Sequence, residues 1–132
     1  MLSFNNKKKE DSSFDPPFFV KFTADSVVKR RKSFESITQK YPTRVPVLVE
    51  RGTMDSPEID KNKFLVPKNI TLADFMTIIR SRIKLESTQS LYFMVGGVMP
   101  RATDYMDILY NKHKNIDDGF LYITYCIENT FG

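Results

Sequence analysis

A strand pattern runs directly into a helix pattern in KFLVPKNITLADFMTIIRSRI, residues 63–83. Residues 63–67 are mostly apolar and stop at a proline, which predicts a short strand. Thr71 followed by Asp74 matches the capping pattern of a helix N-terminus. Apolar residues then recur at i, i+3, i+4, i+7 and i+11 of one helical face, namely Leu72, Phe75, Met76, Ile79 and Ile83. The stretch therefore predicts a strand over 63–67 and an amphipathic helix over 71–83.

Downstream of this stretch, the pattern predicts a strand, a short helix and a final strand. LYFMV, residues 91–95, predicts a strand, and Gly96 and Gly97 predict a turn after it. DYMDILYNKH, residues 104–113, predicts a short helix that Asp104 caps. FLYITYCI, residues 120–127, predicts the last strand.

Upstream, a strand and two helices are expected. RVPVLVE, residues 44–50, predicts a strand, although Pro46 cannot donate to the hydrogen-bond ladder of a central strand. Residues 51–60 form a turn or loop between the two early strands. Residues 27–41 predict an amphipathic helix with a basic flank, and residues 18–22 predict a short helix.

This order of elements is typical of an α+β fold, the β-grasp or ubiquitin-like fold. One helix packs across a four-stranded mixed sheet, and two additional N-terminal helices precede it. We expect a flexible N-terminal arm over residues 1–17. A ubiquitin-like domain follows over residues 18–132, with its helical extension at about 18–41.

Composition limits the function classes. The 132 residues, 41% of them hydrophobic, suit one domain with a modest core. No apolar run is long enough to cross a bilayer, and no secretory signal is evident. One cysteine excludes an internal disulfide and fits a reducing compartment. The net charge of +4 is N-terminal, because residues 1–52 hold 11 Lys and Arg but only 6 Asp and Glu. An acidic partner is expected near that end.

Catalytic chemistry is not expected. Cys126 lies in the last predicted strand, and His113 has no motif around it, so we interpret them as a buried structural thiol and a surface residue. The sequence contains no metal-ligand cluster, no glycine-rich phosphate loop and no Ser/His/Asp constellation. We therefore expect neither a cofactor nor an enzymatic activity.

Three segments resemble the autophagy-related protein 8 family, the group of the light chain 3 and GABARAP modifiers. They are KYPTRVPVLVE (40–50), DKNKFLVPKNITLADF (60–75) and FLYITYCIENTFG (120–132). The resemblance runs from about Phe18 to Gly132, with small length differences near residues 51–60 and 113–119. It implies a ubiquitin-like modifier of autophagy and supports the β-grasp prediction.

The resemblance also implies how such a protein is used. Gly132 would be activated by an E1-like enzyme, passed to an E2-like enzyme and joined to phosphatidylethanolamine. A deconjugating cysteine protease would later separate the protein from the lipid. A glycine has no Cβ to crowd these reacting sites. The protein is expected to be monomeric before conjugation, cytoplasmic when free, and on autophagosomal or related membrane when lipidated.

A second implied function is the binding of autophagy receptors that carry an aromatic-x-x-aliphatic motif. The peptide would add a strand to the edge formed by residues 63–67. The aromatic pocket is expected to be lined by Ile37, Pro46, Lys63, Leu65 and Phe120. The aliphatic pocket is expected to be lined by Phe64, Val66, Pro67, Ile70, Phe75, Ile78 and Arg82. Contacts to acidic residues beside the motif are expected from Arg44, Lys29 and Arg30.

Other interpretations stay open at this point. Phe75 and Ile78 are equally consistent with core packing, and the basic run 29–32 with a solvated helix face. That run has no stacking aromatics nearby, so it is a weak indication of nucleic-acid binding. Ser33 departs from an often acidic family position, which leaves motif preference open. The chain could instead be a peptide-binding adaptor that is never conjugated, or a modifier attached to a protein lysine.

Overall fold

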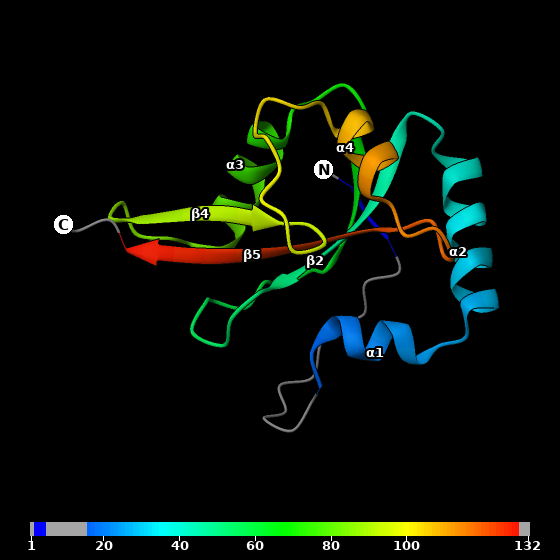
Figure 1. The fold of residues 1–132 in the computed structure, drawn as a ribbon, viewed down its shortest axis with the longest axis horizontal. Coiled ribbons are helices and arrows are strands. Elements are labelled where there is room, and N and C mark those ends of the chain that lie inside the picture. Colours follow the sequence, from blue (N-terminus) through cyan, green and yellow to red (C-terminus); the bar gives the residue numbers. More distant parts are fainter. Residues whose placement is uncertain (1, 5–15, 130–132) are drawn as a thin grey trace.

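The protein is described by a computed structural model, which covers residues 2–4 and 16–129. Its centre is a five-stranded mixed sheet with the order β1-β3-β2-β5-β4 (Figure 1). The strands are β1 (Leu2–Ser3), β2 (Arg44–Arg51), β3 (Lys63–Pro67), β4 (Gln89–Met94) and β5 (Leu121–Asn129). β2 and β5 run parallel, whereas β1–β3, β2–β3 and β4–β5 are antiparallel. The predicted four-stranded mixed sheet of a β-grasp fold is present, with one more short strand at its edge.

The additional strand corrects the prediction of a flexible arm for residues 2–4. Leu2 pairs with Leu65 and Ser3 pairs with Phe64, so this part of the chain extends the sheet. Phe4, directly after β1, is buried. The physical reason is the unpaired edge of β3, which offers hydrogen-bonding groups to any extended segment within reach. The rest of the predicted arm, except Pro16 and Pro17, lies outside the described residues.

Pro46 lies in a central strand without costing a ladder hydrogen bond. The N–H of Val49 donates to the carbonyl of Asn62 at 2.8 Å, so odd-numbered residues of β2 form the hydrogen-bonded pairs with β3. Pro46 is opposite Leu65 in a non-hydrogen-bonded pair, and pairing with β5 begins only at Val47. The missing N–H of Pro46 is therefore tolerated.

Helix α3 (Leu72–Ile83) forms as its sequence predicts. Thr71 Oγ1 accepts from the Asp74 N–H at 3.2 Å, and Asp74 Oδ2 accepts from the Thr71 N–H at 3.0 Å. This reciprocal capping box fixes the first turn. The apolar face packs onto the sheet through the buried residues Leu72, Phe75, Ile79 and Ile83.

Helix α4 (Met106–His113) starts two residues later than predicted, and Asp104 is not its cap. Tyr105 occupies the N-cap position and makes no side-chain capping bond. Asp104 is held in the preceding connection, where its carbonyl accepts from the Leu72 N–H at 2.9 Å. The N–H groups of Met106 and Asp107, at the start of α4, donate to the carbonyls of Ile70 and Lys68 at 2.8 and 3.2 Å, so tertiary backbone pairing replaces the side-chain cap.

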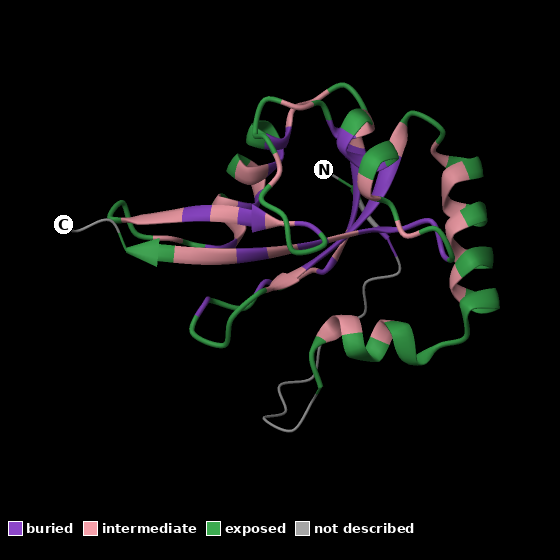
Figure 2. Cartoon of the chain, in the orientation of Figure 1, coloured by how far each residue is buried: buried purple, intermediate pink, exposed green. Residues whose placement is uncertain are grey.

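The helices lie on opposite faces of the sheet. α3 and α4 cover the main core, whereas α1 (Phe18–Ala24) and α2 (Val27–Lys40) lie on the other side (Figure 1). No residue of α1 or α2, all of which the structure describes, is fully buried, and Figure 2 shows both helices half-buried or exposed. Within residues 2–4 and 16–129, no helix has the length and apolar character needed to cross a membrane.

Three tyrosine hydroxyls are held inside the fold. Tyr110 donates to the carbonyl of Gly119 at 2.6 Å, Tyr122 donates to Asp118, and Tyr125 donates to the carbonyl of Pro57. Burial raises the pKa of Tyr110 to about 12 and is also the main cause of the raised pKa values of Tyr122 and Tyr125. The folded state therefore keeps these hydroxyls protonated.

This predicts a loss of stability at high pH. An unfolded tyrosine ionises near pH 10, so above that pH the unfolded chain releases protons that the folded protein retains, at about 1.4 kcal/mol per pH unit for each residue. The free energy of unfolding should be insensitive to these groups below pH 10 and fall above it. For Tyr110 the fall extends to about pH 12. Urea titrations at pH 8, 10 and 11 measure this fall. The variant Tyr110→Phe should show a shallower fall, and parallel curves would contradict the assignment.

Candidate peptide-binding site

Strand β3 sends its side chains to two different hydrophobic clusters. Phe64 and Val66 are buried in the main core under α3, whereas Leu65 belongs to a second cluster on the opposite face. This alternation follows from the period of two along a β-strand. One strand at the edge of the four-stranded core can therefore present groups to both faces of the sheet.

The second cluster brings together most of the predicted aromatic pocket. Its buried members are Phe4, Leu48, Leu65 and Phe120, and Ile37 is among the half-buried side chains packed against it. Pro46 is buried opposite Leu65, and the ammonium of Lys63 lies 5.8 Å from the Phe4 ring centroid. The cluster is referred to below as the aromatic cluster.

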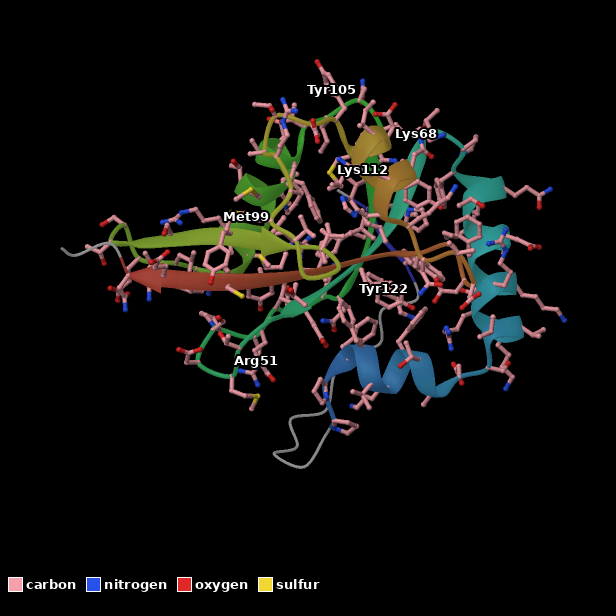
Figure 3. All side chains as sticks on the ribbon, in the orientation of Figure 1. Arg51, Lys68, Met99, Tyr105, Lys112 and Tyr122 are labelled. Carbon is pink, nitrogen blue, oxygen red and sulfur yellow. The ribbon has the colours of Figure 1, made fainter. Side chains whose placement is uncertain are left out.

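Phe120 lies at the centre of the aromatic cluster. Its ring stacks on Phe4 with centroids 6.0 Å apart and planes 9° apart. The rings of Phe22 and Phe34 meet it edge-on at 5.2 and 5.9 Å. These contacts join α1, α2 and β1 to the sheet through one side chain, and edge-to-face pairs of this kind stabilise beyond their buried area. Tyr122, labelled in Figure 3 between β5 and α1, packs against Phe19 and Phe22 beside this centre.

A tight turn before β5 positions Phe120. Asn115 Oδ1 accepts from the N–H groups of Asp117 and Asp118 at 2.8 and 3.0 Å, a local arrangement typical of Asn. Gly119 has φ of +87°, and a Cβ there would lie 2.7 Å from the ring of Phe34. Both the left-handed conformation and the approach of α2 therefore require glycine at this position.

Asp118 fixes the turn to α2. This fully buried carboxylate accepts from Arg30 Nε at 3.1 Å, from the Phe120 N–H at 2.9 Å and from the Tyr122 hydroxyl. Arg30 also donates to the carbonyls of Thr23 and Asp25 at 3.1 and 2.6 Å, and only 11% of its side chain is exposed. Arg30 is thus held by contacts inside the protein, which gives it a different role from the predicted contact with acidic peptide residues.

The other two predicted acidic-flank residues have different positions. Lys29 is exposed on the first turn of α2. Arg44 is half-buried, and its guanidinium donates to the carbonyl of Leu65 at 3.0 Å, on the strand where a peptide would bind. The positive charge of Arg44 is therefore next to β3, whereas Lys29 is on the surface of a helix.

The predicted aliphatic pocket divides into core and surface residues. Phe64, Val66 and Phe75 are fully buried in the main core, with Phe64 and Phe75 edge-on at 5.7 Å. The half-buried members are Pro67, Ile70, Ile78 and Arg82. The Arg82 guanidinium lies over the ring of Phe64, 5.3 Å from its centroid. These four are the members of the predicted pocket that solvent reaches, and Arg82 covers the buried ring of Phe64.

Other predicted residues lie elsewhere. Cys126 is half-buried on β5 opposite Tyr92, and a hydrogen bond with Cys126 is the main cause of the raised pKa of Tyr92. His113 is half-buried at the end of α4. Gly132, the predicted conjugation residue, lies outside the described residues. A cavity of about 260 Å³ between the start of α1 and residues 50–54 contains none of the predicted site residues.

Sequence reasoning missed Phe4 and Asp118 as parts of the site. Phe4 alternates with Leu2 directly before the polar run 5–11, and this strand-like i, i+2 spacing is the signal that could have marked it. Asp118 lies in a polar turn that offers no such signal, because its partner Arg30 is 88 residues away in the chain.

Comparisons with known proteins agree with the observed fold. Residues 29–132 match the model of a family described as "Autophagy protein Atg8 ubiquitin like". Autophagy-related protein 8 of Mycosarcoma maydis is 44% identical over 108 residues, covering 81% of this chain and 91% of that protein. Autophagy-related protein 8a of Arabidopsis thaliana is 42% identical over 113 residues, covering 84% of this chain and 92% of that protein.

Two solved structures are also similar. The crystal structure of Trypanosoma brucei ATG8 has a TM-score of 0.75 at 29% identity, covering 93% of this chain and all of that one (100%). Plasmodium falciparum Atg8, solved in complex with a Plasmodium falciparum Atg3 peptide, has a TM-score of 0.70 at 32% identity. The match covers 78% of this chain and 91% of the Plasmodium chain. With the ubiquitin-like sheet, the two N-terminal helices and these relatives, the chain belongs to the Atg8 family of ubiquitin-like autophagy modifiers.

Proposed function

We propose that this modifier is joined through Gly132 to phosphatidylethanolamine and recruits proteins that carry an aromatic-x-x-aliphatic motif to autophagosomal membrane. Its partners would be E1-like and E2-like conjugation enzymes, a deconjugating cysteine protease and autophagy receptors. Before conjugation it would be a cytoplasmic monomer. The observation that carries the recruitment proposal is the aromatic cluster beside the edge strand β3, which already holds a phenylalanine ring.

Strand β3, the outer strand of the four-stranded core, suits an added peptide strand on the side where β1 now pairs. A strand there gains main-chain hydrogen bonds, and its side chains alternate between the surface and the pockets. An aromatic anchor would occupy the aromatic cluster over Leu65 and Phe120. An aliphatic anchor would rest on Pro67, Ile70 and Ile78, above the buried Phe64.

The proposed peptide site, formed by β3 and the surfaces for the two anchors, is called the groove below. Positive charge around the groove fits acidic residues beside the motif. The Lys63 ammonium lies at the edge of the aromatic cluster, the Arg44 guanidinium reaches from β2 to the Leu65 carbonyl of β3, and Lys29 is on helix α2. These charges steer an acidic peptide toward the groove and raise its association rate, an effect that salt screens. The Atg3 peptide bound by the Plasmodium relative supports a similar encounter between this chain and its E2-like enzyme.

The conjugation step needs little from the folded domain. β5 ends at Asn129, three positions before Gly132 in the sequence, so the predicted conjugation residue is not part of this strand. The amine of the lipid would attack the thioester that joins the Gly132 carboxyl to the E2-like enzyme. The amide bond forms as the thioester C–S bond breaks, and the enzyme thiol leaves with the proton of the amine. The absence of a Cβ lets narrow enzyme sites accept this residue.

The experiment is intact-mass spectrometry of the protein isolated from membranes of its own cells. We expect a mass gain equal to phosphatidylethanolamine, which is lost completely in Gly132→Ala and kept in the matched variant Asn129→Ala, changed at an exposed residue of β5. An unmodified mass in every membrane fraction would overturn lipid conjugation and favour the adaptor. A mass gain equal to another protein would favour attachment to lysine.

A further inference from the structure

Residues 2–4 occupy the place that the proposed peptide would take. Leu2 and Ser3 pair with Leu65 and Phe64, so the outer edge of β3 is already hydrogen-bonded. A sheet edge accepts one strand at a time. An incoming peptide must therefore displace β1 before it can pair with β3.

Phe4 also fills the aromatic cluster. Only 6% of this residue is exposed, its ring stacks on Phe120, and the Lys63 ammonium lies over it. Leu65 and Phe120, both predicted to line the aromatic pocket, are buried in the same cluster. The ring of Phe4 therefore stands where the aromatic anchor of a motif would stand.

We propose that residues 2–4 are an internal occupant of the peptide groove, so that motif-bearing partners bind only when this segment leaves. The inference rests on the proposed peptide groove and adds a regulation to it. β1 runs antiparallel to β3, and the segment brings one aromatic anchor. Competition needs only the shared edge and the shared aromatic cluster, whatever the direction of the displaced strand.

The occupant is attached firmly enough to compete and weakly enough to leave. β1 has only two paired residues, and Leu2 is 42% exposed, so few contacts hold it besides the Phe4 ring. Phe4 belongs to the smaller cluster, so its departure leaves the main core under α3 intact.

The tether compensates for weak contacts. Thirteen residues separate Phe4 from Phe18 at the start of α1. A tether of this length gives an effective concentration on the order of 1 mM. A segment that binds as a separate peptide with a Kd of about 0.1 mM then fills the groove about nine-tenths of the time, and partners bind about tenfold more weakly.

The test uses a synthetic acidic nine-residue peptide with Trp at the aromatic anchor and Leu three residues later. The chain contains no tryptophan, so the fluorescence of the peptide reports binding without a label. Phe4→Ala should bind this peptide about tenfold more tightly than the parent chain. Val28→Ala, which removes a 63% exposed aliphatic side chain from α2, should match the parent.

A second variant keeps the Phe4 ring. Leu2→Pro removes an N–H from β1 and disfavours pairing, so it should also raise the affinity of the Trp peptide severalfold. A synthetic peptide of residues 1–8 should compete with the Trp peptide for this variant, and the same peptide with Phe4→Ala should not. Leu2→Pro and the added peptide decide the question even if Phe4→Ala unfolds the protein.

The outcomes separate the two proposals. Equal affinity of the Trp peptide for the parent and for both variants, without competition by residues 1–8, would overturn the internal occupant and leave the groove in place. Failure of the Trp peptide to bind any form would overturn the groove itself. Tighter binding by the variants, with competition, would support both.

Discussion

Replacing Asp118 with alanine is expected to lower the free energy of unfolding by about 3–5 kcal/mol, a size typical of breaking a buried charge pair. Asp118 is fully buried, and only 11% of the Arg30 side chain is exposed. The variant leaves the Arg30 guanidinium without its counter-ion. It also leaves the Phe120 N–H and the Tyr122 hydroxyl without their acceptor.

Asp118→Ala should weaken peptide binding as well as lower the free energy of unfolding. Asp118 connects α2 to the turn that positions Phe120, and Phe120 is the centre of the aromatic cluster. Loosening this turn shifts the ring on which the aromatic anchor would stack. The affinity for the Trp peptide is therefore expected to fall together with the free energy of unfolding.

Urea unfolding followed by circular dichroism measures the effect. Asp118→Asn keeps an oxygen acceptor but removes the charge. Its free energy of unfolding should therefore fall by less, about 1–3 kcal/mol. Asp117→Ala, a change at the exposed neighbour, should stay within about 0.5 kcal/mol of the parent. A loss below about 1 kcal/mol for Asp118→Ala would show that the buried pair does not hold α2 to the sheet.

The fold could be predicted because its main signals are local. The capping box at Thr71 and Asp74 and the apolar face of α3 lie within one stretch of chain, and the structure reproduces both. β3 also has its predicted bounds. Asp104 shows the limit of this reasoning. It is a good N-cap residue, but the first N–H groups of α4 donate to the carbonyls of Ile70 and Lys68 from another part of the chain, and those contacts have no local signal.

The site was predicted less completely because its contacts are long-range. The aromatic pocket rested on residue positions in a family pattern, and the structure brings Leu65 and Phe120 together from segments far apart in sequence. The same pattern could not show that Asp118 holds Arg30, or that Phe4 fills the pocket. Both depend on which side chains the folded chain brings into contact, and neither spacing nor composition records that.

A substitution of Phe64 tests whether this residue of the predicted aliphatic pocket belongs to the core or to the peptide-binding surface. Phe64→Ala is expected to lower the free energy of unfolding by about 3–5 kcal/mol, the usual cost of deleting a buried ring. Its ring is fully buried, meets Phe75 edge-on at 5.7 Å and lies under the Arg82 guanidinium. The neighbouring main core closes around it from β2 and α3, so the cavity cannot collapse easily.

Ile78→Ala is the matched comparison, because Ile78 belongs to the same predicted pocket but is only half-buried. It should cost about 1 kcal/mol of stability. It should also lower the affinity for the Trp peptide several-fold, because the Leu anchor of the peptide loses apolar contact. Urea midpoints and peptide titrations on both variants separate the roles. If Phe64→Ala keeps parent stability and loses only peptide affinity, the ring is a pocket wall. The core assignment from its burial is then wrong.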